Sequence, residues 1–473
     1  MVNRNSELMK NTIILSIGQV VPKLIAIFVL PLLTTYLTKK DYGLYELTLS
    51  VASFCIPLLS VQIQQGVFRF LIDPENDKKS IITSSLIFVL VMFLLSAIPI
   101  IIAWSMYTQD TVLGILFFCS YLAEVLLTWS GQVTRGLGNN LVYSIAYIVY
   151  SVAFIFVLIL ILIISRTLTA KDVAIAMISA YLLAFSFLFY KNGIYNYLSI
   201  TKQGKNTLKT LLKYSAPMVI SSVALWVVNL SDRFLVSGFL GIEMTAVYSV
   251  ANRIPNLFNS VYNIFNLAWT ENTSKLTETE KKQGYYTTFF KDFYHAMVGM
   301  MIALISVSPL LFKILINNQY ADAYSLMSWL YVGVFFCSLV SFFGSIYVGE
   351  KRTKDVGISS AVGAIINVVV NLLLMERFGV IIAAISTIIS YLIICIYRAI
   401  DLKKYVSISY SLGSLLFGVA IVCGIAAINS SYSIVTTIIS IVVTLVYNVF
   451  FNRQLILNIS KALLRKVGKN NGI

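Results

Sequence analysis

The sequence predicts an all-α fold, a polytopic membrane helix bundle of about fourteen transmembrane helices. Composition is the first reason. Hydrophobic residues make up 58% of the 473 residues and charged residues 12%, whereas soluble domains are roughly 45–50% apolar and 25% charged. The second reason is that apolar runs of about 20 residues recur from Thr12 to Phe451, and each can cross a hydrocarbon core of about 30 Å. The third is that Lys and Arg gather in the short connections.

Each apolar run is assigned to one helix. The first run follows a polar start with Arg4 and Lys10 and lacks a small-residue cleavage site, so we expect a retained helix rather than a removed signal peptide. The predicted spans are 11–37, 43–64, 81–105, 112–134, 141–164, 172–190, 214–240, 245–268, 293–312, 325–348, 356–375, 378–397, 409–428 and 432–451.

Orientation follows from the basic residues, because Lys and Arg concentrate in short cytoplasmic loops. With the N-terminus inside, most of the 35 lysines and arginines fall on the cytoplasmic side. Both termini are therefore expected in the cytoplasm. The net charge of +15 suits contact with anionic lipids of the inner leaflet better than contact with nucleic acid, because the charges sit on separate loops.

All five cysteines lie within apolar runs, where they are best interpreted as small hydrophobic residues. Their spacing matches neither a disulfide framework nor a metal site. We therefore expect no metal, no cofactor and no redox chemistry. The cysteines are Cys55, Cys119, Cys337, Cys395 and Cys423.

The order of the helices predicts two pseudo-symmetric six-helix lobes plus two C-terminal helices. Residues around Tyr45 and Tyr248 match at one constant offset, as expected for halves related by an axis along the membrane normal. The predicted boundaries are 1–200 for the N-terminal lobe, 201–400 for the C-terminal lobe, and 401–473 for the last two helices with a basic cytoplasmic tail. A central cavity is expected between the lobes.

The predicted eighth helix carries five asparagines on one face, a set that we call the asparagine ladder. At about 100° per residue they fall, with Tyr248, within roughly 80° of arc. Interhelical hydrogen bonds worth about 0.6 kcal/mol each explain any single one, but five on one stripe favour a face that lines an aqueous or substrate-filled cavity. The ladder is Asn252, Asn256, Asn259, Asn263 and Asn266.

Pro255 is expected to kink the eighth helix beside Arg253, because proline frees a backbone carbonyl.

Three other predicted helices carry polar stripes of similar width. The stripes are Tyr121, Glu124, Thr128, Gln132 and Arg135 in the fourth helix, Thr12, Ser16, Gln19 and Lys23 in the first, and Ser222, Trp226, Asn229 and Arg233 in the seventh, with Asp232 on its flank.

Ionisable residues inside membrane spans are functional by default, and along these polar stripes the cations outnumber the acids. We therefore expect a cavity that favours an anion, with Arg135 at its cytoplasmic mouth. Two interpretations of the acids stay open: they neutralise nearby cations, or they respond to a coupling ion. The single histidine, His295, is interpreted as an interfacial residue. The cations that lie on or beside these stripes within the spans are Lys23, Arg233 and Arg253, and the acids are Glu124 and Asp232.

Three groups of short motifs carry a family resemblance. The first is Tyr214-Ser-Ala-Pro217, Ser231-Asp-Arg233, Phe239-Leu-Gly241 and Val247-Tyr-Ser-Val-Ala-Asn252; the second is Tyr42-Gly-Leu-Tyr45 and Gly66-Val-Phe-Arg69; the third is Ile366-Asn367, Asn371-Leu-Leu-Leu374, Phe378-Gly379, Ala383-Ala384 and Ser390-Tyr391. With these motifs the sequence resembles the polysaccharide transporters of the multidrug/oligosaccharidyl-lipid/polysaccharide exporter superfamily, in particular the Wzx-type O-antigen flippases. Ile382 departs from the pattern, since a Gly often precedes the Ala pair.

The resemblance implies a flippase, not an enzyme, in the bacterial cell inner (plasma) membrane. By alternating access it would move a polyprenyl-diphosphate-linked oligosaccharide, such as an O-antigen repeat unit for lipopolysaccharide or another surface polysaccharide, from the cytoplasmic to the outer leaflet. Implied partners are this lipid-linked glycan, membrane lipids, and the polysaccharide polymerase and chain-length machinery. Asn side chains offer donors and acceptors to sugar hydroxyls, and Lys and Arg can hold a diphosphate.

The predicted site follows from these stripes. Glu124 and Asp232 are assigned to ion coupling or charge balance. The predicted substrate-binding residues are Lys23, Arg233, Arg253, Asn252, Asn256, Asn259, Asn263, Asn266, Gln132 and Arg135.

Other functions stay open. A multidrug or organic-cation exporter of the same superfamily would need a net-acidic cavity, and the cation excess argues against it. A lipid II flippase shares the third group of motifs. A membrane enzyme of polysaccharide assembly would usually present a large outer loop or a carboxylate motif, and neither occurs in the sequence. A structural scaffold would not need the asparagine ladder.

Overall fold

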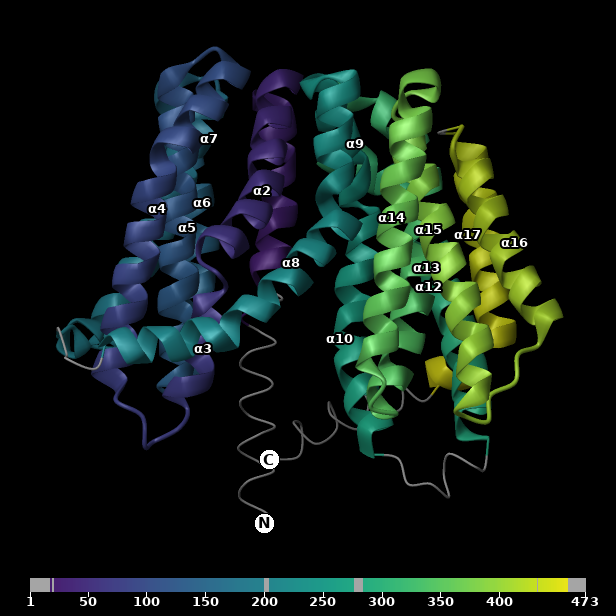
Figure 1. The fold of residues 1–473 in the computed structure, drawn as a ribbon. Helices are drawn as coiled ribbons and strands as arrows, with labels where there is room; N and C mark the ends of the chain where they lie inside the picture. Colours follow the sequence, from purple (N-terminus) through teal and green to yellow (C-terminus); the bar gives the residue numbers. More distant parts are fainter. Residues whose placement is uncertain (1–17, 19–20, 200–203, 276–283, 432, 458–473) are drawn as a thin grey trace, which may run out of the picture. The chain divides into compact units, whose positions relative to one another are not determined.

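The computed structural model describes residues 18, 21–199, 204–275, 284–431 and 433–457. Throughout these ranges the regular secondary structure is helical, without strands (Figure 1), which confirms the all-α fold class. Eleven helices of the described ranges are long and apolar enough to cross a membrane. The other three predicted spans correspond to a shorter apolar helix, Val21–Tyr36, to α8, and to α9 with α10. The protein is a multi-pass membrane protein.

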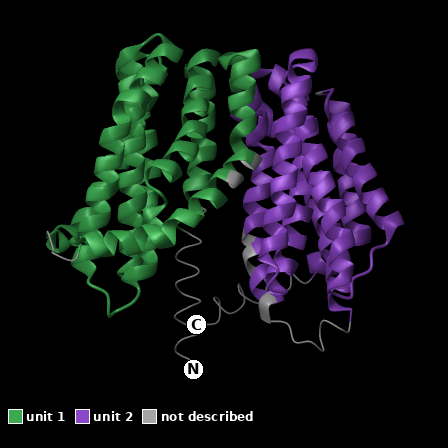
Figure 2. Ribbon diagram, viewed as in Figure 1, with its two compact units in different colours: residues 1–246 green, residues 247–473 purple. Residues whose placement is uncertain are grey.

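The chain divides into two compact units, residues 1–246 and 247–473 (Figure 2). Unit 1 contains α2 (Lys39–Leu59), α3 (Ile63–Leu71), α4 (Lys78–Thr108), α5 (Thr111–Gly136), α6 (Asn140–Ser165), α7 (Ala170–Lys191), η1 (Ile194–Tyr197), α8 (Gly204–Leu240) and the start of α9 (Ile242–Arg253). Unit 2 contains the rest of α9, then α10 (Pro255–Lys275), α12 (Tyr285–Leu315), η2 (Asn318–Tyr320), α13 (Asp322–Gly349), α14 (Thr353–Phe378), α15 (Ile381–Asp401), η3 (Leu402–Lys404), α16 (Leu412–Asn429) and α17 (Ile434–Phe451).

The predicted lobe boundaries differ from this division in their placement of α8. Within unit 1, α8 packs on α2, α3 and α4. The three predicted ranges, 1–200, 201–400 and 401–473, stay a prediction about symmetry.

The predicted second span is two helices, α2 and α3, separated at Ser60–Gln62. Pro57 lies in the last turn of α2, and Val61 and Gln62 have φ angles of 48° and 52°, in the left-handed region that side chains other than glycine seldom adopt. The Gln62 amide nitrogen donates to Ser222 Oγ of α8 at 2.7 Å. The sequence did not predict this break, because hydrophobicity indicates where the chain crosses the bilayer but not whether the helix is continuous.

Short polar caps begin several helices. Asp110 accepts a hydrogen bond from the Leu113 backbone N–H at 3.1 Å, which starts α5. A capping box between Thr169 and Asp172 starts α7. Both caps satisfy backbone donors that the first helical turn leaves unpaired.

The core of unit 1 combines large apolar side chains with paired polar atoms. The Trp129 indole donates to Ser85 Oγ at 3.0 Å, which joins α5 to α4. The Trp104 indole donates to the Tyr121 hydroxyl at 3.0 Å in the same pair of helices. Buried Trp and Tyr usually find such partners, so these bonds set which faces of α4 and α5 meet.

Unit 2 is held together by aromatic stacking and by a polar seam. Trp269 of α10 stacks on Phe289 of α12 and on Phe342 of α13, with ring centroids 4.2 and 4.8 Å away. The seam joins α12 to the last helix: His295 Nδ1 lies 2.7 Å from the Tyr447 hydroxyl, and Ser306 Oγ lies 2.9 Å from Thr444 Oγ1. The last two helices are therefore integral to unit 2.

Candidate functional site

Arg135 is held in place at the end of α5 without an acidic partner. Its guanidinium carbon lies 4.5 Å from the Phe68 ring centroid and 5.4 Å from that of Tyr143, and Nη1 donates to Gln132 Oε1 at 3.3 Å. Its Nε is buried without an acceptor among the described residues, and no described carboxylate pairs with it. A planar guanidinium with an unused donor suits a carboxylate or phosphate ligand.

Close contact between α5 and α3 creates this arrangement. A Cβ on Gly136 would lie 2.6 Å from Leu71 Cβ, nearer than real side chains come. Glycine therefore lets the end of α5 approach the end of α3 and brings the Phe68 ring beneath Arg135. Both rings favour a cation electrostatically.

Glu124 lies three turns from Arg135 along α5, in a cluster of tyrosines. The Tyr181 hydroxyl of α7 hydrogen-bonds its carboxylate, while its Oε2 is buried with no partner among the described residues. The rings of Tyr181 and Tyr150 stack 4.5 Å apart. Lys23, the cation of the predicted first helix, is exposed near the start of the first described helix and forms no described ion pair with Glu124.

Arg233 of α8 forms an ion pair with Glu46 of α2, with Nε 3.4 Å from Oε2. The Glu46 side chain is 3% exposed and that of Arg233 is 15% exposed. Asp232, on the flank of the same stripe, is also buried. Glu46 belongs to no polar stripe, because it stands alone on its helix, although an acid within the predicted span 43–64 itself indicates a functional or paired residue.

The rest of the α8 stripe packs inside unit 1. The Trp226 indole donates to the Ser50 carbonyl of α2 at 2.7 Å, and Ser222 accepts from Gln62. The side chain of Asn229 lies outside the described set. These contacts join α8 to the broken second helix, so this part of the stripe contributes to packing.

The asparagine ladder lies in unit 2 and is divided by a helix break. The helix is interrupted at Ile254, before Pro255, in line with the predicted kink. The ladder is therefore carried by two helices, and its arc of roughly 80° stays a prediction. Asn252 stays on α9, where its amide donates to the Tyr248 carbonyl at 2.9 Å. Arg253, half-buried, ends α9.

The two ends of the α10 portion differ. Asn256 and Asn263 are exposed, and the Asn259 amide donates to Asn256 Oδ1 at 3.1 Å. Asn266 Oδ1 instead accepts from Ser345 of α13 and from Tyr262, both at 2.9 Å. Asn266 therefore joins helices, whereas Asn256, Asn259 and Asn263 retain hydrogen-bonding capacity.

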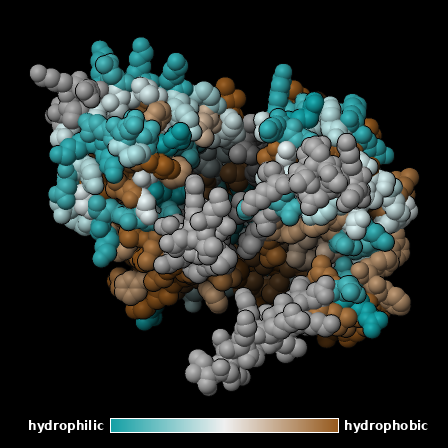
Figure 3. Space-filling model, turned by 90° about the horizontal axis from the view of Figure 1, so that it is seen from below, coloured by the Kyte–Doolittle hydropathy of each residue, from teal (hydrophilic) through white to brown (hydrophobic). Residues whose placement is uncertain are grey.

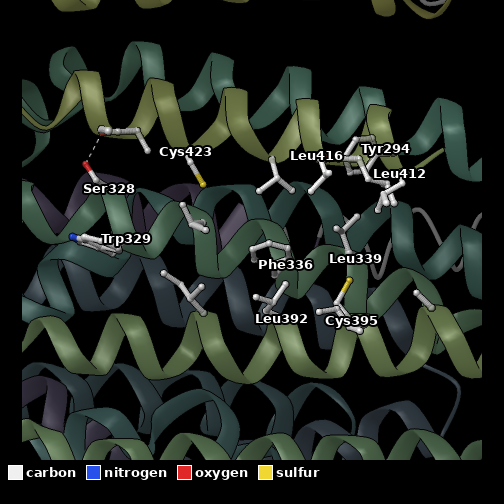
Figure 4. Close-up of a pocket in the computed structure, with 18 of the residues that line it drawn as sticks. Tyr294, Ser328, Trp329, Phe336, Leu339, Leu392, Cys395, Leu412, Leu416 and Cys423 are labelled. Carbon is white, nitrogen blue, oxygen red and sulfur yellow. Dashed lines mark hydrogen bonds between the residues drawn. The ribbon is translucent and has the colours of Figure 1, made fainter. Parts of the chain in front are cut away.

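Unit 2 also contains an apolar pocket of about 860 Å³ between α16 and helices α12, α13 and α15 (Figure 4). Its lining is almost wholly hydrocarbon, sulfur and aromatic carbon. Ser328 at one end donates to the Ala426 carbonyl, so its hydroxyl hydrogen is already bonded within the protein. Such a lining can hold an aliphatic or isoprenoid chain by apolar contact. Labelled lining residues include Trp329, Phe336, Leu339, Leu392, Cys395, Leu416 and Cys423.

Arg398 is a further buried cation that the sequence placed in a cytoplasmic segment. It is 2% exposed and donates to Ser359 Oγ at 3.0 Å, to the Val340 carbonyl at 2.8 Å and to the Val356 carbonyl at 3.0 Å. These bonds join α13, α14 and α15. The Arg398 guanidinium donates to acceptors within the protein, whereas the Nε of Arg135 has no described acceptor.

The structure thus brings some predicted site residues together within each unit. In unit 1, Gln132 contacts Arg135; in unit 2, Asn256 contacts Asn259. Lys23 is exposed and forms no ion pair among the described residues.

Comparison with known proteins agrees with this fold. A family model described as "Polysaccharide biosynthesis protein" matches residues 8–270, and one described as "MatE" matches residues 217–373. An uncharacterized membrane protein of Methanocaldococcus jannaschii is 22% identical over 425 residues, covering 80% of this chain and 81% of the relative.

Among solved structures, the lipid II flippase MurJ in an inward closed conformation matches with a TM-score of 0.72 at 15% identity, over 94% of this chain and 100% of that chain. An inward-facing multidrug resistance MATE family transporter of the MOP superfamily matches with a TM-score of 0.62 at 14% identity, over 81% and 98%. These likenesses establish the fold. The first family match covers more than half of the chain, so the protein belongs to the polysaccharide biosynthesis protein family.

Proposed function

We propose that this protein is a flippase for a polyprenyl-diphosphate-linked oligosaccharide. It would carry an O-antigen unit or another surface polysaccharide repeat unit from the cytoplasmic to the outer leaflet by alternating access, and would not act as an enzyme. We place it in the bacterial inner membrane with both termini in the cytoplasm. The family match supports a role in polysaccharide biosynthesis, and the motifs described above favour the Wzx-type branch.

The observation that carries the proposal is the state of Arg135. Its charge is balanced by no described carboxylate, its Nε has no described acceptor, and two aromatic rings restrict its orientation. A diphosphate supplies both the missing charge and the missing acceptor. Gln132, already bonded to Arg135, offers an amide donor to the same ligand.

The remaining predicted residues would each contact the part of the substrate that matches their chemistry. Asn252, Asn256, Asn259 and Asn263 would hydrogen-bond the glycan, while Asn266 would mainly support α10. Lys23, Arg233 and Arg253 would add positive potential for the anionic group. The apolar pocket of unit 2 has a lining that suits the polyprenyl chain.

Glu124 and Asp232 stay proposed as ion-coupling or charge-balancing residues. A buried carboxylate oxygen without a partner, as at Glu124, is costly in a membrane interior. It therefore favours a group that gains a proton, a cation or a hydrogen bond during the transport cycle.

Complementation tests the proposed function. In a host that assembles a surface polysaccharide and lacks its own flippase gene, lipid-linked repeat units should accumulate on the inner leaflet. The wild-type chain should relieve this accumulation, and the Arg135→Ala variant, expressed to the same level, should not. If the chain leaves the accumulation unchanged but restores export of drugs or of lipid II in matching deletion hosts, the proposed substrate is wrong.

A further inference from the structure

The first turns of α8 form an amphipathic segment at the end of unit 1. Figure 1 shows them lying across the lower ends of neighbouring helices before α8 turns upward. Leu211 is 1% exposed, and Leu208 and Leu212 pack against the core of unit 1. Lys205, Lys209 and Lys213 are exposed. Their spacing of four residues places them on one side of the helix, and we call them the lysine face.

The lysine face is fixed by contacts on its buried side. Thr207 Oγ1 lies 2.8 Å from Ser80 Oγ in the first turn of α4. The Tyr214 ring makes an edge contact with Phe70 of α3, with centroids 5.7 Å apart. The three ammonium groups are therefore presented outward by a helix that the fold holds on two sides.

The charges of the lysine face are not neutralised within the described part of unit 1. None of the three lysines forms a described ion pair. The nearby loop before α4 contains Asp73 and Asp77, whose carboxylates accept from the Glu75 and Lys79 backbone N–H groups. These acids cap their own loop, and Lys78, Lys79 and Lys191 add further positive charge to the same end.

Exposed tyrosines mark the same level of unit 1. Tyr190 is 71% exposed and Tyr195 is 50% exposed, and their rings lie 6.3 Å apart. The η1 segment that carries Tyr195 is tied to α4 by a hydrogen bond from Thr83 to the Tyr197 carbonyl at 3.1 Å. Tyrosine is enriched where a membrane meets water. From below, Figure 3 shows hydrophilic residues over the ends of the units and hydrophobic residues on their flanks.

We propose that the lysine face binds the phosphate groups of anionic phospholipids in the leaflet that it meets. Lysine offers flexible, strongly hydrated point charges, which suit a fluid layer of headgroups. Three such charges near an anionic surface should strengthen binding on the order of a hundredfold. The site differs from Arg135, whose planar group is confined by two rings, and it does not depend on the identity of the transported glycan.

Lipid titration of the purified full-length protein tests the proposal. Phosphatidylglycerol or phosphatidylcholine is added to the protein in neutral detergent, and bound lipid is counted by native mass spectrometry. The variant Lys205→Gln/Lys209→Gln/Lys213→Gln should lose about a hundredfold in affinity for phosphatidylglycerol and none for phosphatidylcholine. Replacement of the three lysines by Arg should preserve the binding.

A matched control separates a local site from net charge. Lys40→Gln/Lys313→Gln/Lys351→Gln removes the same number of exposed charges from scattered positions and should bind phosphatidylglycerol like the wild type. Equal losses in the two triple variants, or no loss in the first, would overturn the proposal. Competition by short-chain polyprenyl diphosphate for the lysine face would overturn the choice of phospholipid as the ligand. Because binding is measured without transport, these outcomes stand apart from the flippase test.

Discussion

Glu46 on α2 and Arg233 on α8 form an ion pair inside unit 1, with the carboxylate oxygen 3.4 Å from the guanidinium Nε. The two residues are separated by most of the unit in sequence and meet where α8 crosses the second helix. Arg233 therefore has a structural partner in addition to its proposed contact with substrate. Loss of transport after substitution of Arg233 alone would therefore not distinguish a structural role from a role in substrate binding.

Replacement of Arg233 by Gln should destabilise unit 1. The change removes the ion pair of the Glu46 carboxylate, which is 3% exposed, and breaking a buried pair in this way typically costs about 3–5 kcal/mol. The free energy of unfolding in detergent micelles measures the effect. The double variant Glu46→Gln/Arg233→Gln removes both charges and should recover most of the loss. Equal stability of the single variant and the wild type would refute a structural role for the pair.

Replacement of Arg135 should act on transport and leave stability nearly unchanged, because its neighbours Phe68, Tyr143 and Gln132 are neutral. We expect Arg135→Ala to reduce translocation of a short-chain polyprenyl-diphosphate oligosaccharide at least tenfold, since a charge-assisted hydrogen bond is worth about 1.5–3 kcal/mol. Arg135→Lys should be intermediate, because it retains the charge but loses the planar donor group.

The measurement is the rate of substrate translocation in proteoliposomes. Arg398→Lys is a useful comparison, since Arg398 is bonded throughout by the fold and should show its effect in stability. Unaltered translocation by Arg135→Ala would remove Arg135 from the proposed site.

The native cysteines can report on the apolar pocket. Cys423 lines the pocket and is exposed, whereas Cys119 belongs to unit 1 and is not among the lining residues. A membrane-permeant thiol reagent should modify Cys423, and a long-chain polyprenyl phosphate should slow this modification severalfold by occupying the same space. Modification of Cys119 should keep its rate. Equal protection of both cysteines would indicate a general membrane effect, and protection of neither would leave the pocket without its proposed occupant.

The stability of unit 1 near the start of α5 should depend on pH in the acidic range. Lys171 Nζ lies 2.6 Å from Asp110 Oδ2, and its hydrogen bond, followed by that of the Leu113 N–H, lowers the pKa of the Asp110 carboxyl. Since the folded-state pKa lies below the unfolded value of about 3.9, the contribution is present above that pH and is lost as the pH falls through the lowered pKa. The pair is half exposed, so the effect should be small.

Asp110→Asn is the matched variant, because Asn is an equally good helix cap that cannot titrate. The unfolding midpoint of the variant should change less than that of the wild type between pH 5 and pH 3, which spans the unfolded pKa of about 3.9. Parallel acid profiles would show that the ion pair contributes nothing measurable.

Much of the fold is predictable from sequence because the bilayer imposes it. A span must be long and apolar, and this signal located eleven helices that the structure also finds. The details that failed are those in which the backbone departs from a regular helix within an apolar run. No glycine marks the break at Val61 and Gln62, and the asparagine ladder is divided between α9 and α10 at Ile254.

The site was less predictable than the fold because polar stripes do not identify their partners. The contact of Gln132 with Arg135 follows from helical spacing alone, since residues three apart share a face. The contact of Glu46 with Arg233 depends on which helices are neighbours. Arg398 lies just beyond the predicted span 378–397, yet it is part of α15, and backbone carbonyls and a hydroxyl from α13 and α14 accept its hydrogen bonds.

The polar seam between α12 and α17 has a consequence for biosynthesis. His295 leaves the ribosome 152 residues before Tyr447, its hydrogen-bonding partner, and Ser306 precedes Thr444 by 138 residues. At roughly 5–20 residues per second, α12 must wait for about 8 to 30 seconds in or beside the insertion machinery before these partners on α17 are made. Assembly of unit 2 therefore ends only when the last helix arrives, and a nascent chain stalled before α17 would be an early target for membrane quality control.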